Sequence, residues 1–349
     1  MYPGVFDNRF VKAVRVGTSG AVEVVEMDEP RIGPGEALLR TRVSGICGSD
    51  LLDWYVRGKA GSVLGHELSG EIVAVGDGVT DFAPGDRVVP HHHAPCFSCV
   101  HCEAGRYVHC AEWRASRLDP GGMAERVRIP AGNLARDTQK VPDGVSDEAA
   151  SFTEPLATVV KAFRRGHFGA GLSFFGVGLG TTGQLALRLA RASGASRLAG
   201  ADRVASRLDL ARTAGAEVVN VDREPLAPAA LRLSGGRGFD FVLVCPGKAD
   251  AVRDAVGAVA PGGTLLVFTM AAPGDTWAAD LNGLYFREIA VVPSYSCGPD
   301  DTRDALAAIG SGRVAVDDLV SHRFGIAEAA EAFARARRPE GSMKVVLAF

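Results

Sequence analysis

The chain has 349 residues, of which 47% are hydrophobic and 23% are charged. A single compact core rarely grows to this length, so two domains are expected. The formal charge of −3 gives no electrostatic attraction to nucleic acid or to an anionic membrane, and no long apolar run is present. Residues 1–9 lack the basic flank and apolar centre of a signal peptide, which favours a cytoplasmic location with reduced cysteines.

The first part of the chain has the pattern of an antiparallel β region. Short β-like runs alternate with turns such as Gly33-Pro34-Gly35, and no long helical period is visible. The expected strands are 11–16, 21–26, 37–43, 70–75 and 87–90. The β pattern continues through 120–123, 126–130 and 133–141.

One thiol, one imidazole and one carboxylate, those of Cys47, His66 and Glu67, lie between the expected strands 37–43 and 70–75. Zinc accepts sulfur, nitrogen and oxygen ligands together, whereas magnesium and calcium prefer oxygen alone. A Cys-x18-His pair by itself is more often a buried thiol and a structural histidine. Two downstream features, a cysteine cluster and a glycine-rich turn, favour instead a catalytic zinc with a free position for substrate.

Four cysteines follow in a single loop, in the pattern Cys96-x2-Cys99-x2-Cys102-x7-Cys110. Four thiolates can close a tetrahedron around zinc, and such a closed site stabilises a loop without leaving room for chemistry. The alternative is four unrelated loop cysteines. His101 and His109 lie between them and could substitute as ligands, but the four thiols already fill the shell.

Three adjacent histidines, His91, His92 and His93, precede this loop. Neighbouring residues in an extended chain point to opposite faces, so at most two of them can face one way. We interpret them as lining or structural residues, one of which could face the substrate cleft.

The pattern changes after residue 141. Ser146 is a candidate N-cap, followed by two acidic residues in the first turn of a helix. Glu154 then precedes Pro155 in an apolar setting, where a carboxylate is costly unless something pairs with it.

The second half of the chain alternates strands with helices. This alternation indicates a parallel sheet with right-handed crossovers, the doubly wound arrangement. The expected strands are 172–177, 197–201, 239–245 and 264–269, and the expected helices are 184–192, 203–214 and 249–259. Residues 281–297 are expected to lead out of this region, helices at 300–309 and 326–336 and a strand at 344–348 to close the chain, and 224–230 to form a surface stretch.

The glycine-rich turn has the form Gly178-x-Gly180-x-Thr182-Gly183, between an expected strand and an expected helix. Gly178 allows the tight turn, Gly180 the approach of a pyrophosphate, and Gly183 close packing of the helix, whose N-terminus favours the anion. Asp202 ends the next strand, where it can accept hydrogen bonds from ribose hydroxyls and repel a 2′-phosphate. NAD is therefore favoured over NADP, although Arg203 beside this acid could pair with a phosphate.

Together these motifs resemble the zinc-dependent medium-chain dehydrogenases of the alcohol, polyol and threonine dehydrogenase kind. The resemblance covers nearly the whole chain, through 45–50, 65–67, the four-cysteine loop, 154–157 and the glycine turn. It implies an α/β protein, in which a β-rich GroES-like catalytic domain (1–155 and 296–349) flanks a doubly wound Rossmann nucleotide-binding domain (156–295). It also implies a homodimer or homotetramer.

By this resemblance Cys47, His66 and either Glu67 or Glu154 bind the catalytic zinc, while the four-cysteine loop binds a structural zinc. Ser49 matches the hydroxyl that takes the substrate proton, and Asp50 an acid that orients the histidine ligand. Many members carry a histidine relay where this chain has Leu52. Another group must complete that relay, such as one of the histidines at 91–93 or a water chain, or the cofactor ribose ends it.

The activity expected from the resemblance is reversible hydride transfer between NAD and a secondary alcohol of a polyol, sugar, cyclitol or amino alcohol, giving a ketone. Two alternatives are an epimerase that cycles its bound NAD and a catalytically silent NAD-binding protein. Aromatic and charged residues that could line the substrate cleft, or equally be packing or surface residues, are Trp54, Tyr55, Arg57, Trp113, Arg114 and Tyr295.

Overall fold

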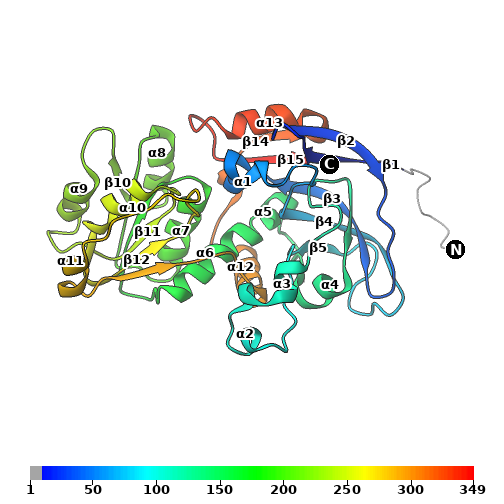
Figure 1. The fold of residues 1–349 in the computed structure, drawn as a ribbon, viewed down its shortest axis with the longest axis horizontal. Coiled ribbons are helices and arrows are strands. Elements are labelled where there is room, and N and C mark those ends of the chain that lie inside the picture. Colours follow the sequence, from blue (N-terminus) through cyan, green and yellow to red (C-terminus); the bar gives the residue numbers. More distant parts are fainter. Residues whose placement is uncertain (1–9) are drawn as a thin grey trace.

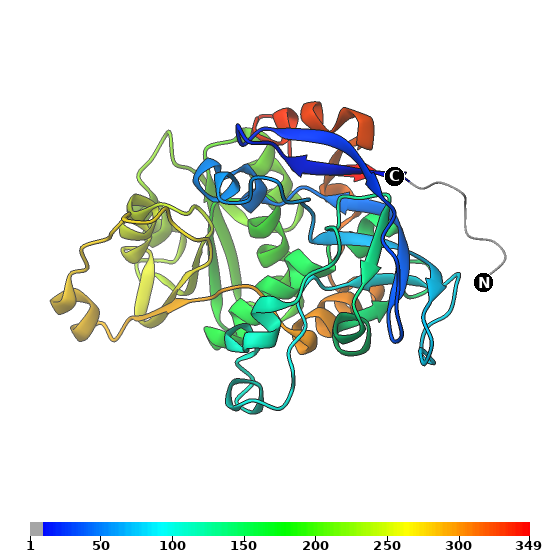
Figure 2. The ribbon, with the colours of Figure 1, turned by 45° about the vertical axis from the view of Figure 1, so that its right-hand side comes forward.

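The structure is a computed structural model that describes residues 10–349, so the expectation for residues 1–9 lies outside the described residues. Figure 1 shows a region built around a parallel sheet on the left and a region of mostly antiparallel strands on the right. The rotated view in Figure 2 shows the first strands and the last strand of the chain together in the second region. The first and last parts of the chain therefore build one β-rich unit.

The β-rich unit contains a seven-stranded sheet in the order β14-β15-β3-β4-β5-β7, in which β6 also pairs with β3. All pairs are antiparallel except that of β14 with β15. A separate hairpin joins β1 (Phe10–Val16) to β2 (Val22–Asp28). The strands of the larger sheet are β3 (Ala37–Gly45), β4 (Glu67–Val75), β5 (Arg87–Pro90), β6 (Arg126–Ile129), β7 (Thr138–Lys140), β14 (Val320–Gly325) and β15 (Lys344–Ala348).

The prediction of a β structure over 133–141 is wrong for most of that stretch. Residues Ala131–Asp137 form helix α4, and only β7 follows as a strand. The buried side chains of Asn133, Leu134 and Asp137 are one, and then three, residues apart, which is a helical spacing. Asn133 and Asp137 both bond to the segment that follows β5, so tertiary contacts also favour the helix.

The second sheet has six strands in the order β10-β9-β8-β11-β12-β13, and all of its pairs are parallel. This order is the doubly wound one, with the reversal of strand order next to β8. The strands are β8 (Ser173–Val177), β9 (Arg197–Asp202), β10 (Glu217–Asn220), β11 (Phe239–Val244), β12 (Val259–Val267) and β13 (Ala290–Pro293). The segment 281–297 therefore supplies the sixth strand as well as the exit from the sheet.

Helices connect these strands. They are α7 (Thr181–Ala192), α8 (Ala205–Thr213), α9 (Leu226–Leu233), α10 (Ala249–Val256) and α11 (Leu281–Phe286). The interpretation of 224–230 as a surface stretch is wrong, because Leu226, Ala229 and Ala230 of α9 are buried against the sheet. Their spacing matches one face of a helix, a signal that the two prolines of the segment obscured.

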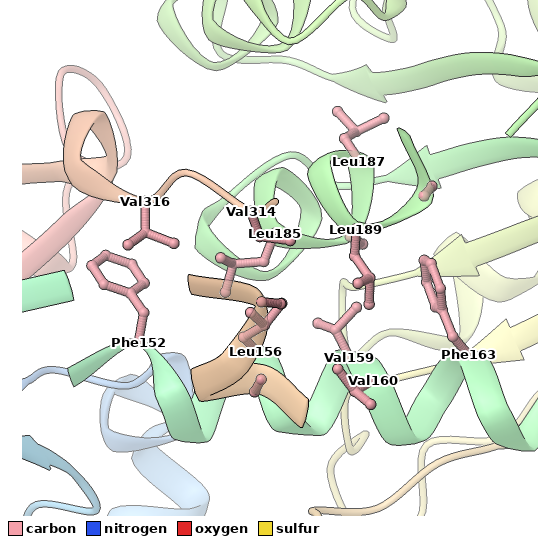
Figure 3. Packing of buried hydrophobic residues seen from close by; sticks show 14 of the residues in the cluster. Phe152, Leu156, Val159, Val160, Phe163, Leu185, Leu187, Leu189, Val314 and Val316 are labelled. Atoms are coloured by element: carbon pink, nitrogen blue, oxygen red, sulfur yellow. The ribbon is translucent and has the colours of Figure 1, made fainter. Parts of the chain in front are cut away.

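Helix α6 (Thr153–Arg165) and helix α12 (Pro299–Gly310) lie between the two sheets and pack on one another (Figure 1). Figure 3 shows the apolar face of α6, where Phe152, Leu156, Val159 and Phe163 meet residues of α7 and of 314–316. The same core includes residues of both sheets. The expected domain limits at 155/156 and 295/296 remain predictions, and the first of them falls inside α6.

The remaining elements are short. Helix α5 (Asp147–Ser151) begins at the predicted cap, where the Ser146 hydroxyl accepts a hydrogen bond from the Ala149 N–H at 3.0 Å. The others are η1 (Gly48–Leu51), α1 (Asp53–Arg57), α2 (Val100–Glu103), η2 (Tyr107–His109), α3 (Ala111–Ala115), η3 (Asp317–Leu319), η4 (Ile326–Glu328) and α13 (Ala329–Ala336). Within 10–349, no helix is both long and apolar enough to cross a membrane.

Candidate metal centre and nucleotide site

Cys47, His66 and Glu67 come together at one end of the β-rich sheet. Each offers one donor atom, and the three atoms lie within 4.8 Å of one another. Cys47 precedes the short helix η1, His66 lies just before β4 as predicted, and Glu67 is the first residue of β4. The spacing of this S, N and O set suits a zinc ion about 2.0 to 2.3 Å from each ligand.

Gly45 makes this arrangement possible. It lies on β3 between Glu67 of β4 and the last strand β15, and a Cβ at this position would lie 2.5 Å from Glu67 Oε2 and 2.6 Å from Lys344 Cε. Without that Cβ, the Lys344 ammonium reaches the Glu67 carboxylate and also donates to the Ile46 carbonyl at 3.1 Å. Both side chains are buried, so the Lys344 ammonium neutralises the charge of the Glu67 carboxylate inside the protein.

Asp50 is buried beside the donor group, and its carboxylate accepts a hydrogen bond from the backbone. Its Oδ2 accepts from the Cys47 N–H at 3.2 Å, while Oδ1 has no hydrogen-bond partner within 10–349. Burial alone would lower the pKa of His66, but the Cys47 thiol group and the Asp50 carboxylate outweigh burial and raise this pKa well above its usual value. Asp50 therefore acts on His66 through charge, and its role as an orienting acid stays a prediction. Ser49 is half-buried on η1, beside Asp50.

Glu154 lies on the first turn of α6, where it belongs to a second donor group with His91 and Cys297. The residue is 7% exposed, and its carboxylate has no hydrogen bond to any described residue. Burial raises the pKa of Glu154, and the charges of His66 and Glu67 also act on it. Its charge therefore lies within electrostatic reach of the first donor group.

The three adjacent histidines have different surroundings, as the alternation along an extended chain predicts. His91 bonds through Nδ1 to Asp137 at 2.8 Å, and His93 through Nδ1 to the Ser116 carbonyl at 2.9 Å. The His92 ring lies 5.2 Å from the His66 ring, and its buried Nδ1 has no hydrogen-bond partner in the described chain. His92 is therefore the one beside the first donor group.

The four cysteines of the 96–110 loop form one cluster, with all four sulfur atoms within 4.8 Å of one another. The closest pairs are separated by 3.5 Å for Cys96–Cys110, 3.6 Å for Cys99–Cys102 and 3.9 Å for Cys96–Cys102. A zinc tetrahedron with bonds of about 2.3 Å has sulfur–sulfur edges of about 3.8 Å, so these distances fit a closed site. His101 and His109 lie outside this group of four donors.

The glycine turn joins β8 to α7 in the parallel sheet, next to the point where the strand order reverses. Gly178 has φ +82°, a conformation that favours glycine, and a Cβ on Gly183 would overlap the Gly178 carbonyl oxygen. Gly180 caps α7, and Thr182 lies in the first turn of that helix. The described geometry is that of a pyrophosphate-binding turn.

Asp202 ends β9 and is buried next to this turn. Its Oδ2 accepts from the Leu179 N–H at 2.7 Å, and its Oδ1 accepts from the N–H groups of Arg203 and Val204 at 2.8 and 2.9 Å. The carboxylate therefore also holds the turn in place, which the sequence did not reveal. The Arg203 side chain is exposed and pairs with Asp222 at 3.4 Å.

The six candidate cleft residues differ in exposure, and the rings of Trp113 and Tyr295 lie 5.9 Å apart. Trp113 is fully buried and packs 4.0 Å from the His93 ring, and Arg114 donates to the Val108 carbonyl at 3.0 Å, so both support the four-cysteine loop. Trp54 and Tyr295 are exposed, and the Trp54 and Tyr55 rings lie 5.7 Å apart. Arg57 is exposed beside the β1–β2 turn.

Sequence reasoning missed three residues of the two donor groups and their surroundings. Lys344 was predicted only as the start of a strand, Asp137 as part of another strand, and Cys297 as part of a connection. No local pattern marks them, because their partners Glu67, His91 and Glu154 are far away in the chain.

Two family profiles match the chain. The alcohol dehydrogenase GroES-like domain covers residues 33–143, and the zinc-binding dehydrogenase profile covers residues 181–311. The chain is 31% identical over 328 residues to the L-threonine 3-dehydrogenase of Bacillus licheniformis, covering 91% of this chain and 92% of that protein. It is 32% identical over 340 residues to the sorbitol dehydrogenase of Bombyx mori, covering 93% and 95%.

A solved structure has the same architecture. The chain superposes on a zinc-binding dehydrogenase of Sinorhizobium meliloti 1021 bound to NADP with a TM-score of 0.87 and 27% identity, covering 97% of this chain and 99% of that one. A GroES-like unit joined to a doubly wound sheet, with a four-thiol cluster and a Cys–His–Glu donor group, defines a zinc-binding dehydrogenase.

The chain belongs to the zinc-dependent medium-chain alcohol and polyol dehydrogenase family. The prediction of the family, of its fold class, and of an oxidoreductase with zinc and a nicotinamide dinucleotide as cofactors is confirmed.

Proposed function

We propose that this enzyme transfers hydride reversibly between NAD and a secondary alcohol of a polyol, sugar, cyclitol or amino alcohol, which becomes a ketone. The observation that carries the proposal is the Cys47–His66–Glu67 donor group, in a chain that also has a glycine turn at the reversal point of a parallel sheet. Relatives named for threonine and for sorbitol support an amino alcohol or polyol as substrate.

The residues of the donor group have separate tasks. Cys47 and His66 supply the sulfur and nitrogen ligands. Glu67, whose charge Lys344 already offsets, supplies the oxygen ligand, and Glu154 is its exchange partner. A zinc ion held by these residues would make an alcohol oxygen more acidic, and a nicotinamide dinucleotide held at the glycine turn would supply the hydride acceptor. Ser49 accepts the substrate proton, and the rigid turn that Asp50 closes on the Cys47 N–H keeps Ser49 in place.

Leu52 cannot carry a proton onward, so another group has to do so. We propose His92, because its ring lies next to the His66 ring and its Nδ1 is unpartnered among the described residues. His91 and His93 each use Nδ1 for a contact that holds them in place. In a His92→Ala variant, turnover should fall while NADH affinity stays the same, and an unchanged turnover would remove His92 from the path.

NAD is proposed as the preferred cofactor, because the Asp202 carboxylate lies next to the turn where the adenosine ribose binds in this fold. A negative charge there opposes a 2′-phosphate. The relative from Sinorhizobium meliloti bound NADP, and two arginines could favour NADP here: the exposed Arg203, and Arg207, whose guanidinium lies 3.7 Å from Asp202 Oδ2. The ratio of kcat/KM for the two dinucleotides decides between them.

The decisive experiment is a screen of polyols, sugars, cyclitols and amino alcohols with NAD, followed by NADH absorbance. One substrate class should give continuous NADH release in proportion to ketone formed. Epimerised product without NADH release would replace the proposal by internal cycling of the cofactor. A protein with full zinc and bound NAD that turns over no member of any class would be a silent binding protein.

We also propose a cytoplasmic homodimer joined at the edge of the parallel sheet. Strand β13 is the last strand of that sheet, and Leu281, Tyr285 and Phe286 of the adjacent helix α11 are each 76% exposed. Exposed apolar residues beside an unpaired strand edge are typical of an interface. A Tyr285→Lys/Phe286→Lys variant should run as a monomer in size-exclusion chromatography, whereas an unchanged elution volume would place the interface elsewhere.

A further inference from the structure

A second group of metal-type donors lies beside the first. His91 follows β5, Glu154 begins α6, and Cys297 lies in the connection between β13 and α12. The three donor atoms are within 4.8 Å of one another, and the residues are 2%, 7% and 0% exposed. A nitrogen, an oxygen and a sulfur donor therefore converge in the interior, from three distant parts of the chain.

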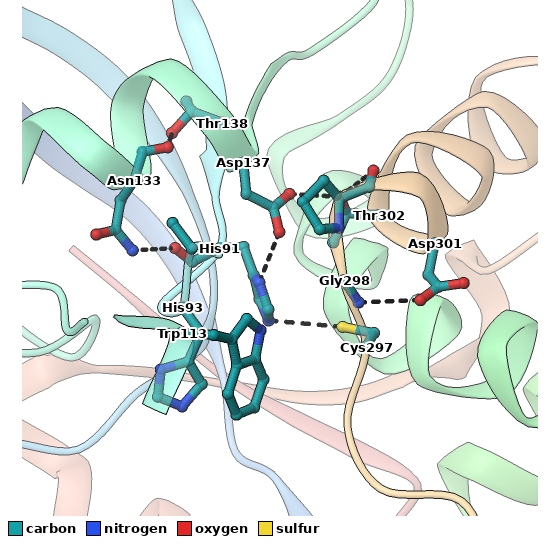
Figure 4. Close-up of polar contacts among 12 residues, drawn as sticks. His91, His93, Trp113, Asn133, Asp137, Thr138, Cys297, Gly298, Asp301 and Thr302 are labelled. Carbon is teal, nitrogen blue, oxygen red and sulfur yellow. Dashed lines mark hydrogen bonds and ion pairs between the residues drawn. The ribbon is translucent and has the colours of Figure 1, made fainter. Parts of the chain in front are cut away.

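His91 is oriented as a metal ligand. Figure 4 shows its Nδ1 bonded to Asp137 and its Nε2 directed at Cys297. Asp137 Oδ2 takes Nδ1–H at 2.8 Å, and the Thr302 hydroxyl donates to Asp137 Oδ1 at 2.5 Å. When a carboxylate accepts the hydrogen of one ring nitrogen, the lone pair of the other nitrogen can bind a metal. This is the usual arrangement of metal-binding histidines.

The distance between the two donors in Figure 4 also suits a metal. His91 Nε2 lies 3.5 Å from Cys297 Sγ. In a zinc tetrahedron, a nitrogen at about 2.05 Å and a sulfur at about 2.3 Å are separated by about 3.5 Å. The backbone of His91 is held at both ends, by the Asp137 carbonyl at 2.8 Å and by the Asn133 side chain at 3.0 Å, so this geometry is preorganised.

Glu154 supplies the independent evidence for a cation. The residue is 7% exposed, and its carboxylate has no hydrogen bond or ion pair with any residue of 10–349. A buried carboxylate without a partner costs several kcal/mol, unless it takes up a proton or binds a cation. Lys344, the buried ammonium in this region, is already paired with Glu67.

We propose that His91, Glu154 and Cys297 form a second zinc-binding position next to that of Cys47 and His66, with Glu154 common to both. Zinc fits best, because the three donors are sulfur, nitrogen and oxygen. Binding forms one bond to each donor, and the Cys297 thiol releases its proton to the buffer. The inference rests on the proposed function only through the shared Glu154.

A consequence is that excess zinc inhibits the enzyme. An ion in the second position draws Glu154 away from the first position, where the proposed function uses it as the exchange ligand. Dialysed enzyme should hold two zinc ions per chain, and added zinc should fill a third position as activity declines.

The experiment titrates the dialysed, zinc-loaded enzyme with Co²⁺ and measures bound metal and thiolate-to-cobalt absorption. The wild type should bind a third equivalent with a new thiolate band. Cys297→Ser and Cys297→Ala should bind two ions only, without that band, and with melting temperatures that show a folded protein. The alanine variant avoids a buried hydroxyl, in case the serine variant does not fold.

Two further variants test the geometry. Cys245→Ser, at a partly buried cysteine outside both donor groups, should keep the third equivalent. Asp137→Asn should lower the affinity for the third ion by roughly 10- to 100-fold. This is the typical effect of losing the carboxylate that holds a histidine ligand.

A wild type that binds no third ion, or a Cys297→Ala variant that still shows the thiolate band, would overturn the second position. In either case an active two-zinc enzyme would leave the proposed function intact. Full activity without zinc would instead contradict the proposed function, whereas the Cys297-dependent band would still support the second position.

Discussion

The four-cysteine loop and the Cys47–His66–Glu67 group both gather metal donors, but they are built in different ways. The loop takes all four sulfurs from fifteen consecutive residues, 96–110, and packs them against its own Val108 and against Trp113 of the helix that follows. The other group takes its donors from two segments, 47 and 66–67, and is completed by Lys344 from the end of the chain. A local closed cluster of four donors supports a fold, whereas a group of three donors at the end of a sheet leaves one coordination position for substrate.

The largest expected effect is on turnover. Cys47→Ala removes one donor of the open group, so kcat should fall at least about 1,000-fold, because metal activation contributes several kcal/mol to the barrier. The measurement is steady-state kinetics on the best substrate, with NADH binding followed by fluorescence and expected to be unchanged. Asp209→Asn, on the exposed face of α8, is the control. Near-normal turnover in Cys47→Ala would contradict a catalytic role for this donor group.

The closed cluster should respond in the opposite way. Cys99→Ser should release the structural zinc and lower the free energy of unfolding by several kcal/mol, because the loop has little other core. Turnover per folded molecule should change by less than about threefold, since the cluster supplies no group to the reaction. Denaturant unfolding and zinc content measure the effect; an unchanged transition with full metal would contradict it.

The Lys344–Glu67 ion pair tests a second difference between the two groups of donors. Only the Cys47–His66–Glu67 group depends on a charge from a distant part of the chain. In the metal-free protein, Lys344→Met leaves Glu67 buried without a cation, so the free energy of unfolding should drop by about 3–5 kcal/mol. The double variant Lys344→Met/Glu67→Gln removes both charges and should recover most of that loss. Equal stability of the single and double variants would show that the pair is not what neutralises Glu67.

The smallest effect concerns the nucleotide end of the cleft. Asp202→Asn removes the charge, so the ratio of kcat/KM for NADP over NAD should rise by about tenfold, or about 1.4 kcal/mol. Asparagine has a single acceptor oxygen and therefore gives up at least one of the hydrogen bonds from the N–H groups of Leu179, Arg203 and Val204, so the free energy of unfolding is measured in parallel. Asp209→Asn on the exposed face of α8 is the control. A ratio unchanged by Asp202→Asn would assign cofactor choice to other residues.

Sequence patterns predicted most strands, because short β-like runs such as Val11 to Val16 are bounded by turn residues and form strands in the structure. They failed where tertiary contacts decide, as at 133–141, where Asn133 and Asp137 bond to the His91 segment and the chain is helical. The donors that are close in sequence were found, namely the four thiols and His66–Glu67. Those whose partners lie far away in the chain were missed, as with Cys297 and Lys344, since no periodicity records a contact across about 140 or 280 residues.

The second donor group also depends on contacts between residues that are distant in the sequence. His91 was seen only as one of three adjacent histidines, and its partner Cys297 as an unremarked thiol in a connection. The structure joins them at 3.5 Å, because α4 and α12 meet through Asp137 and Thr302. The spacing of residues along the sequence cannot predict this contact between His91 and Cys297, because the fold alone brings the two residues together.

The most direct test of the account is the zinc content of purified wild type and of Cys47→Ala, measured alongside turnover. The wild type should hold two zinc ions per chain after dialysis, and Cys47→Ala should hold one and be inactive while still binding NADH. A Cys47→Ala protein that keeps both ions, or one that turns over substrate at the rate of the wild type, would contradict the claim that this donor group holds the catalytic metal.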